Sequence, residues 1–176
     1  ANTFRKMPYA KQLATNVYTW GVYLKLLVAP FPLTVDYYPR HIDIMSFSDP
    51  GVILSVFAYA AMFWALWFFY QKNRVVVFSI FFFLVTLSIV SNVVFPIGTN
   101  MSERFLFMPS LGFCLLIPEI IYAITKKGRV VLNICMIAVV AFALKTVTRN
   151  PVWKNDFTLF TTDVEVSKNS AKVLNA

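Results

Sequence analysis

The chain has 176 residues, of which 59% are hydrophobic and 14% charged, and its mean hydropathy is +0.66. This composition excludes an ordinary soluble domain and is typical of a membrane protein. The net charge of +8 does not indicate nucleic-acid binding, because eight of the sixteen basic residues lie in short polar segments before or between long apolar runs. Membrane insertion accounts for basic residues in such segments. We therefore expect membrane lipid, and no nucleic acid, as a partner.

Five apolar runs predict membrane-spanning helices and an all-α fold. A helix needs roughly 20 apolar residues to cross a bilayer core, and all the runs except the first approach that length. The first is shorter and is interrupted by Asn16, Thr19 and Lys25, so it either spans with a polar face toward protein or lies flat at the interface. Strands would have to form a closed barrel, and the alternating polarity of barrel strands is missing. The predicted spans of this transmembrane domain, residues 1–148, are 13–29, 51–70, 75–95, 105–124 and 130–148.

The distribution of charge gives these spans an orientation. The segment before the first run and the breaks at 72–74 and 126–129 carry Lys and Arg without Asp or Glu, whereas the acidic residues fall almost entirely in the other breaks and the tail. Short basic loops remain on the cytoplasmic side of a bilayer. We therefore expect a cytoplasmic N-terminus, extracytoplasmic loops at 30–50 and 96–104, and an extracytoplasmic tail from Arg149.

The tail, residues 149–176, predicts the start of a helical repeat. Asn155 or Asp156 can cap a first helix that ends at Val166, and Ser170 can cap a second helix. The apolar face expected for the first helix comprises Phe157, Phe160 and Val164. Such a unit needs neighbouring repeats to bury this face. Because the chain also does not begin with Met, we expect it to be a fragment of a longer protein.

Basic side chains on the predicted outer side form a candidate site for an anionic ligand. Lys25 and Lys145 lie within about one turn of the outer ends of their runs, where the charge rule alone would not place them. Together with Arg40, Arg104 and Arg149 they can form a basic rim that attracts an anionic lipid-linked substrate. The alternative for the two lysines is that their long side chains simply reach back to the interface.

Glu103, Arg104 and Glu119 each allow two interpretations. Arg104 can bind a phosphate through two parallel hydrogen bonds, or it can pair with Glu103 at the membrane boundary. Glu119 lies inside an apolar run, where an ionisable residue is a functional candidate by default. Because Glu119 is close to the cytoplasmic end of its run, a carboxylate tolerated at the interface is the favoured interpretation.

The loop at 31–41 concentrates polar and aromatic residues, among them Asp36, Tyr37 and Tyr38. Asp36 either acts as a base or orients an acceptor hydroxyl, or it caps a turn in the loop. The single histidine of the chain, His41, predicts no metal site. Asn92 belongs to a polar stripe at the outer end of the third run, which either contacts another helix or lines a cavity.

Three segments of the chain resemble the transmembrane and tetratricopeptide-repeat-containing (TMTC) proteins, especially their bacterial branch. The segments are 23–39, 88–114 and Arg149-Asn-Pro-Val-Trp153 with the repeat start that follows. The stretch 103–112, Glu-Arg-Phe-Leu-Phe-Met-Pro-Ser-Leu-Gly, is the most specific of the matching sequences. The similarity extends from about Leu13 to the end of the chain.

This resemblance implies a membrane glycosyltransferase of the C superfamily, which transfers a sugar from a polyprenyl-phosphate carrier to protein, the sugar being mannose in the eukaryotic relatives. It implies no cofactor, and a protein acceptor or partner bound through repeats outside the cytoplasm. The membrane would be the bacterial inner membrane, or that of the endoplasmic reticulum in a eukaryote. The residues expected at the donor phosphate are Arg104, Lys25, Arg40 and Lys145, with Glu103, Tyr37, Tyr38 and Asn92 in support.

The resemblance also implies that the chain alone is inactive. In this superfamily the catalytic acidic residues lie in the first extracytoplasmic loop, upstream of the part that this chain matches, which leaves Asp36 as a possible catalytic residue here. Two other functions fit the sequence. One is a non-catalytic membrane anchor that presents a repeat scaffold to protein partners, and the other is a fragment of a transporter.

Overall fold

The computed structural model describes residues 8–34, 37, 42–92 and 101–166. Within these ranges the chain forms α-helices and short 3-10 helices and contains no strand, which confirms the predicted all-α fold. Three helical stretches are long and apolar enough to cross a membrane: Pro50–Phe69, Glu103–Thr125 and Gly128–Lys154. These stretches indicate a membrane protein.

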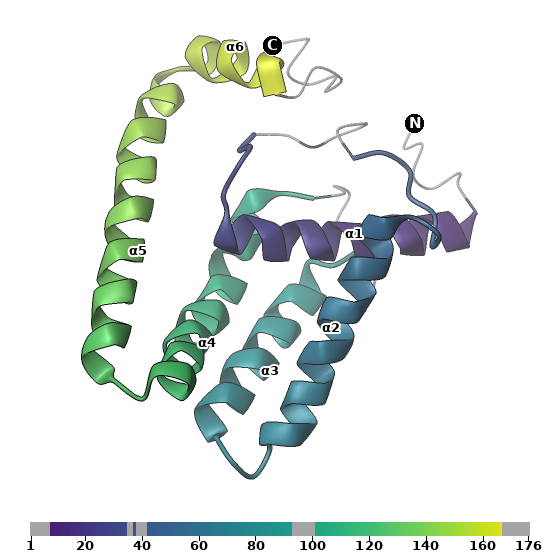
Figure 1. The fold of residues 1–176 in the computed structure, drawn as a ribbon. Coiled ribbons are helices and arrows are strands. Elements are labelled where there is room, and N and C mark those ends of the chain that lie inside the picture. The colour runs from purple at the N-terminus through teal and green to yellow at the C-terminus, as the bar shows by residue number, and fades with distance from the viewer. Residues whose placement is uncertain (1–7, 35–36, 38–41, 93–100, 167–176) are drawn as a thin grey trace.

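Four helices run up and down beside one another (Figure 1). They are α2 (Pro50–Phe69), α3 (Arg74–Ile89), α4 (Phe107–Thr125) and α5 (Gly128–Arg149). α3 is apolar but, at 16 residues, shorter than the other three. The turns from α2 to α3 and from α4 to α5 lie at one end of the bundle, and the longer connections lie at the other end. We call these two ends the basic end, after Lys72, Arg74 and residues 126–129, and the loop end.

α3 and α4 pack with their backbones in close contact. A Cβ atom placed on Gly112 of α4 would lie 2.5 Å from the carbonyl oxygen of Ser79 and 3.0 Å from the amide nitrogen of Phe83, both in α3. Ser79 is fully buried at this crossing. Small residues permit such close approach between membrane helices, where packing rather than the hydrophobic effect drives association.

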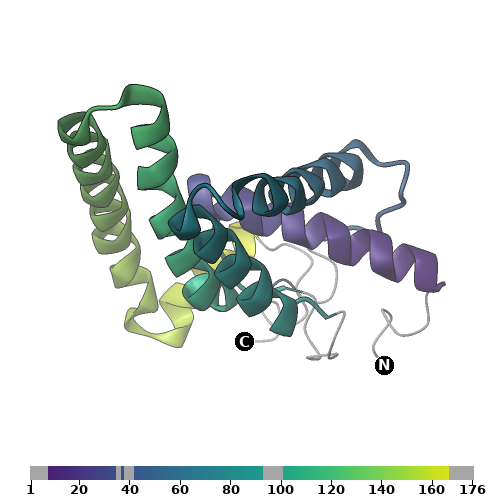
Figure 2. The same ribbon diagram turned by 90° about the horizontal axis from the view of Figure 1, so that it is seen from below.

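α1 (Tyr9–Val28) does not run parallel to the other helices but crosses the loop end of the bundle. Figures 1 and 2 show it extending from beyond α2 at its N-terminal end to α4 at its C-terminal end. α1 therefore differs from the parallel arrangement expected of a fifth span at 13–29, and it is not among the helices that are long and apolar enough to cross a membrane. It ends at Val28 because Pro30 and Pro32 follow.

Although α1 is less apolar than α2 to α4, it is the helix with the most buried residues. Its buried side chains include Asn16 and Thr19, which interrupt the apolar pattern in the sequence. Tyr59 of α2 donates a hydrogen bond to the carbonyl oxygen of Trp20 at 3.1 Å, and the Thr15 hydroxyl accepts one from the amide of Met45 at 3.0 Å. α1 is thus held between the end of α2 and the loop that follows α1.

The main hydrophobic core lies at the loop end rather than in the middle of the bundle. Its members come from α1, the following loop, α2, α3 and the segment that leads into the 3-10 helix η2 (Glu103–Leu106). By contrast, no residue of α5 is buried. The apolar surface of α5 is that of a helix surrounded by lipid or by other spans, whereas the loop end is built as a protein interior.

The tail folds back across the loop end. After the 3-10 helix η3 (Asn150–Lys154) comes α6 (Asp156–Val166), and the Asn155 side chain caps it by accepting a hydrogen bond from the amide of Thr158 at 2.8 Å. The predicted Asn155 cap of this helix is confirmed, and α6 is described as far as Val166. Of the predicted apolar face, Phe160 is half-buried, and the side chains of Phe157 and Val164 lie outside the described ones. Leu159 and Asp163 of α6 are buried. The second predicted helix, from Ser170, lies outside the described residues.

Candidate functional site

Glu103 connects the start of η2 to the loop that follows α1. Its Oε1 atom accepts a hydrogen bond from the amide of Thr34 at 2.7 Å and another from the Tyr37 hydroxyl at 2.8 Å. Burial raises the pKa of Tyr37 far above its ordinary value, and the adjacent Glu103 carboxylate raises it further. The Tyr37 hydroxyl therefore stays protonated and remains a hydrogen-bond donor to Glu103 at any physiological pH.

Arg149, at the end of α5, connects the same loop to α6. Its guanidinium donates to the Asp163 carboxylate at 2.6 Å and to the carbonyl oxygen of Leu33 at 3.3 Å. The Asp163 side chain is completely buried, whereas that of Arg149 is 19% exposed. A buried carboxylate that lost its cation would be strongly destabilising. Arg149 therefore fixes both the start of the repeat region and the position of the loop.

These contacts form one structure, which we call the loop clamp. Its members are Leu33, Thr34, Tyr37, Glu103, Arg149 and Asp163. The loop clamp brings together the α1–α2 loop, η2, the end of α5 and α6, which are far apart in the sequence. Tyr23 of α1 supports it, because its buried hydroxyl accepts a hydrogen bond from the amide of Ser102 at 3.2 Å.

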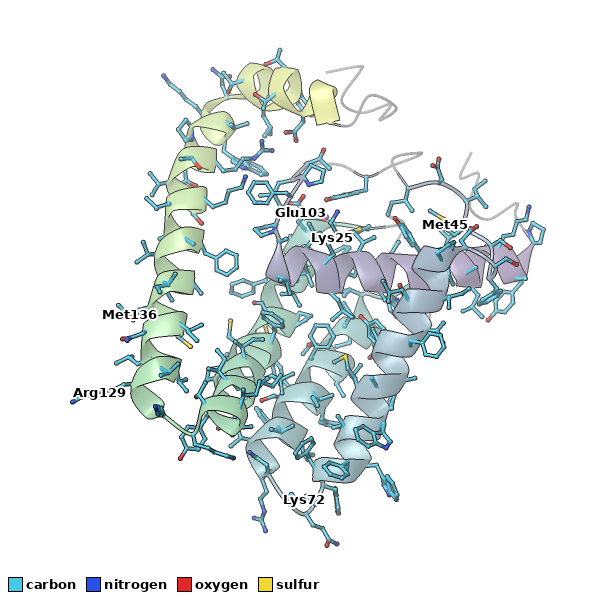
Figure 3. The ribbon with its side chains drawn as sticks, in the orientation of Figure 1. Lys25, Met45, Lys72, Glu103, Arg129 and Met136 are labelled. Atoms are coloured by element: carbon cyan, nitrogen blue, oxygen red, sulfur yellow. The ribbon has the colours of Figure 1, made fainter. Side chains whose placement is uncertain are left out.

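A cavity of about 200 Å³ lies beside the loop clamp, between α1 and the loop that follows it. Lys25, Phe31, Tyr37 and Asp43 are among its lining residues, and the Lys25 side chain is exposed. Figure 3 shows Lys25, Glu103 and Met45 at the same end of the molecule, opposite Lys72 and Arg129. The cavity is of a size to admit a small polar group, with a cation at its edge.

Phe31 brings a second lysine to this region. The Nζ atom of Lys145, in α5, lies 3.7 Å from the centroid of the Phe31 ring, which is a cation–π contact. Phe31 also lines the cavity with Lys25. Neither lysine makes an ion pair within the described part of the chain. Of the predicted donor-site cations, Lys25 thus lines the cavity and Lys145 contacts a residue of its lining.

The remaining predicted site residues either do not line the cavity or lie outside the described residues. Arg104 is exposed, with its guanidinium carbon 5.5 Å from the Phe105 ring centroid, and it does not line the cavity. Asn92 is half-buried just beyond α3, with a positive φ of 58°, and is also not part of the cavity lining. The other predicted residues, Asp36, Tyr38, Arg40 and His41, lie outside the described residues.

The sequence did not single out Phe31 or Asp163. Phe31 is adjacent to a proline in an aromatic-rich loop, and nothing in its sequence context distinguishes it from its neighbours. The burial of Asp163 could have been inferred from the sequence, because Asp163 follows Leu159 by four residues and therefore lies on the same face of α6. A carboxylate on a buried helix face requires a cation, and Arg149 is the nearest preceding Arg in the sequence.

Comparison with known proteins identifies relatives for most of the chain. The mouse protein O-mannosyl-transferase TMTC3 is 38% identical over 88 residues, which cover 48% of this chain and 10% of the relative. The Caenorhabditis elegans protein O-mannosyl-transferase F38B6.6 is 28% identical over 165 residues, which cover 92% of this chain and 24% of the relative. This chain is similar to the TMTC protein O-mannosyl-transferases.

The human protein O-mannosyl-transferase TMTC1 also matches, at 26% identity over 96% of this chain and 20% of its own length. The chain thus spans about a tenth to a quarter of the length of these relatives. No family model and no solved structure matches the chain.

Proposed function

We propose that this chain is the part of a TMTC-like glycosyltransferase that holds the phosphate of a polyprenyl-phosphate sugar while the sugar, mannose or a similar hexose, is transferred to protein. The observation that carries the proposal is that Lys25 lines the cavity next to the loop clamp, while Lys145 lies over the ring of Phe31, another residue of the cavity lining. The similarity to protein O-mannosyl-transferases supports the reaction class.

The two lysines suit the chemistry of this transfer. An acceptor hydroxyl forms a new bond to the anomeric carbon, while the bond between that carbon and the phosphate oxygen breaks and polyprenyl phosphate leaves. Negative charge increases on the departing phosphate, and ammonium groups held nearby stabilise it. Phe31 keeps Lys145 in place without neutralising it, because a cation–π contact leaves the positive charge available to a second partner.

The membrane arrangement that fits this site places the loop end outside the cytoplasm. α2 to α5 then cross the bilayer, and the basic end, with Lys72 and Arg129, lies on the cytoplasmic side. We propose that α1 lies at the outer interface, because it crosses the ends of the bundle and buries its polar residues against protein. The segment before α1 is then extracytoplasmic, in place of the cytoplasmic position expected from its charge.

The catalytic base is proposed to come from a part of the complete protein that precedes this chain. The chain alone should therefore bind but not turn over a donor. Asp36 remains a candidate residue for positioning the acceptor. Assignment to the bacterial branch and the tetratricopeptide character of the tail also remain predictions, since the relatives described above are animal proteins.

Replacing the two lysines in the complete protein tests the proposal. Lys25→Gln and Lys145→Gln should each lower kcat/KM for a polyprenyl-phosphate sugar by about tenfold, the loss of one charge-assisted contact. Lys154→Gln is the matched control, because Lys154 is an exposed lysine of η3 at the same end and does not line the cavity. Unchanged transfer by both lysine variants would contradict the proposed donor site.

The same experiment separates the alternative function, a membrane anchor that presents helical repeats to protein partners. The position of α6 supports this alternative, because Arg149 and Asp163 attach the start of the tail rigidly to the membrane region. An anchor needs this attachment but not the lysines. Transfer unaffected by the lysine variants, with protein binding lost when Arg149 is replaced, would favour the anchor.

A further inference from the structure

A groove at the basic end has the form of a lipid-binding site. It has a volume of about 580 Å³ and lies between the end of α2, the turn and the first part of α3. Its lining residues are Tyr70, Gln71, Arg74, Val77, Phe78 and Phe81. The polar members are at the end of the bundle and the apolar members lie further along α3. Arg74 and Phe81 are seven residues apart, so the α3 members share one face of the helix.

The guanidinium of Arg74 is available to a ligand. Arg74 is exposed and makes no ion pair with any residue in the described ranges. The carboxylate of Glu119, in α4, accepts a hydrogen bond from the Asn73 side-chain amide at 2.8 Å. Asn73 also caps α3, since its Oδ1 accepts from the amides of Val75 and Val76. The cap therefore holds Glu119, and no ion pair joins Glu119 to Arg74 within the described residues.

The surroundings of Arg74 are positively charged. The Lys72 ammonium lies 3.5 Å from the centroid of the Phe68 ring, which fixes it beside the groove without neutralising it. Lys126 and Lys127 of the α4–α5 turn and Arg129 in the first turn of α5 lie at the same end of the bundle (Figure 3). Basic pockets between membrane helices attract anionic lipid headgroups, and a guanidinium can bind a phosphate through two hydrogen bonds.

We propose that this groove binds one anionic phospholipid. The phosphate contacts Arg74, with Tyr70 and Gln71 as further hydrogen-bond donors, and an acyl chain lies along Val77, Phe78 and Phe81. The apolar half of the groove selects a lipid over a free phosphate, which would leave these phenyl rings uncovered. The groove is beside Lys72, at the opposite end of the bundle from Lys25 (Figure 3), so it does not depend on the proposed sugar transfer.

Lipid retention by the complete protein tests this proposal. The protein is assembled in nanodiscs of phosphatidylcholine that also contain phosphatidylglycerol, released, and examined by native mass spectrometry for bound phosphatidylglycerol. We expect one retained molecule on the unmodified protein. Arg74→Gln should weaken retention by about tenfold, the loss of one charge-assisted contact. Phe81→Ala should also weaken it, because the acyl chain loses apolar contact.

The control variant is Arg129→Gln, which removes the same charge at the same end of the bundle but outside the groove. It should retain the lipid as well as the unmodified protein does. Equal loss in Arg129→Gln and Arg74→Gln would show diffuse attraction and overturn the proposal, as would full retention in Arg74→Gln. Glycerol phosphate added to nanodiscs of pure phosphatidylcholine should not bind, and its binding at Arg74 would identify a phosphate site in place of a lipid site.

Discussion

At the scale of single residues, the loop clamp depends most on Arg149. Arg149 lies at the end of α5, and its side chain contacts both the loop after α1 and α6. Its partner Asp163 is completely buried, so water cannot take the place of the Arg149 guanidinium at the Asp163 carboxylate. Glu103 has a comparable position at η2, although it is held by an amide and a hydroxyl rather than by a cation.

Arg149→Ala should release α6 from the loop end. Removing the cation from a buried ion pair costs about 3–5 kcal/mol. Protection of α6 amides from hydrogen exchange should fall strongly in the complete protein. Replacing both partners, Arg149→Ala with Asp163→Ala, should restore part of this protection, because the buried charge is then gone. If the double variant exchanges as fast as Arg149→Ala, the pair does not hold α6.

At the scale of elements, the contact between α3 and α4 is the tightest in the bundle. Gly112 and Ser79 allow the two backbones to meet, and no other side chain fits at Gly112 without movement. α5, by contrast, has no buried residue. α3 and α4 therefore form the rigid part of the membrane region.

Gly112→Ala should destabilise the α3–α4 pair. The added Cβ would lie 2.5 Å from a backbone oxygen, and overpacking of this kind costs about 1–3 kcal/mol. Gly128→Ala makes the same substitution at the start of α5, where no atom lies within 4 Å, and should leave stability unchanged or raised. Thermal unfolding of both variants in nanodiscs checks this. Equal midpoints would mean that the helices are not in close contact at Gly112.

The sequence predicts the helices better than it predicts the contacts between them. Long apolar runs indicate helices by length alone, and the Asn155 cap of α6 follows from a local pattern. The loop clamp has no such local signal, because Thr34 and Glu103 are 69 residues apart and Leu33 and Arg149 are 116 apart. The sequence of α1 also does not determine whether this helix crosses the end of the bundle or runs parallel to the other helices. Asn16 and Thr19 suit a buried face in either orientation.

At the scale of the whole molecule, the two ends of the bundle have different chemistry. The loop end contains the buried core, the loop clamp and the cavity beside Lys25. The basic end has short turns, free cations and an open groove. Insertion of the bundle into a bilayer in one fixed direction would account for this asymmetry, and the proposed donor site depends on the claim that the loop end lies outside the cytoplasm.

Labelling with a membrane-impermeant thiol reagent tests this claim most directly. In a complete protein with Cys114 and Cys135 replaced by Ala, single cysteines are placed at Lys11, Lys127 and Lys154, all exposed positions. We expect Lys154→Cys and Lys11→Cys to react in sealed cells and Lys127→Cys to react only after permeabilisation. Labelling of Lys127→Cys in sealed cells, with protection of Lys154→Cys, would contradict the proposed orientation and with it the location of the donor site.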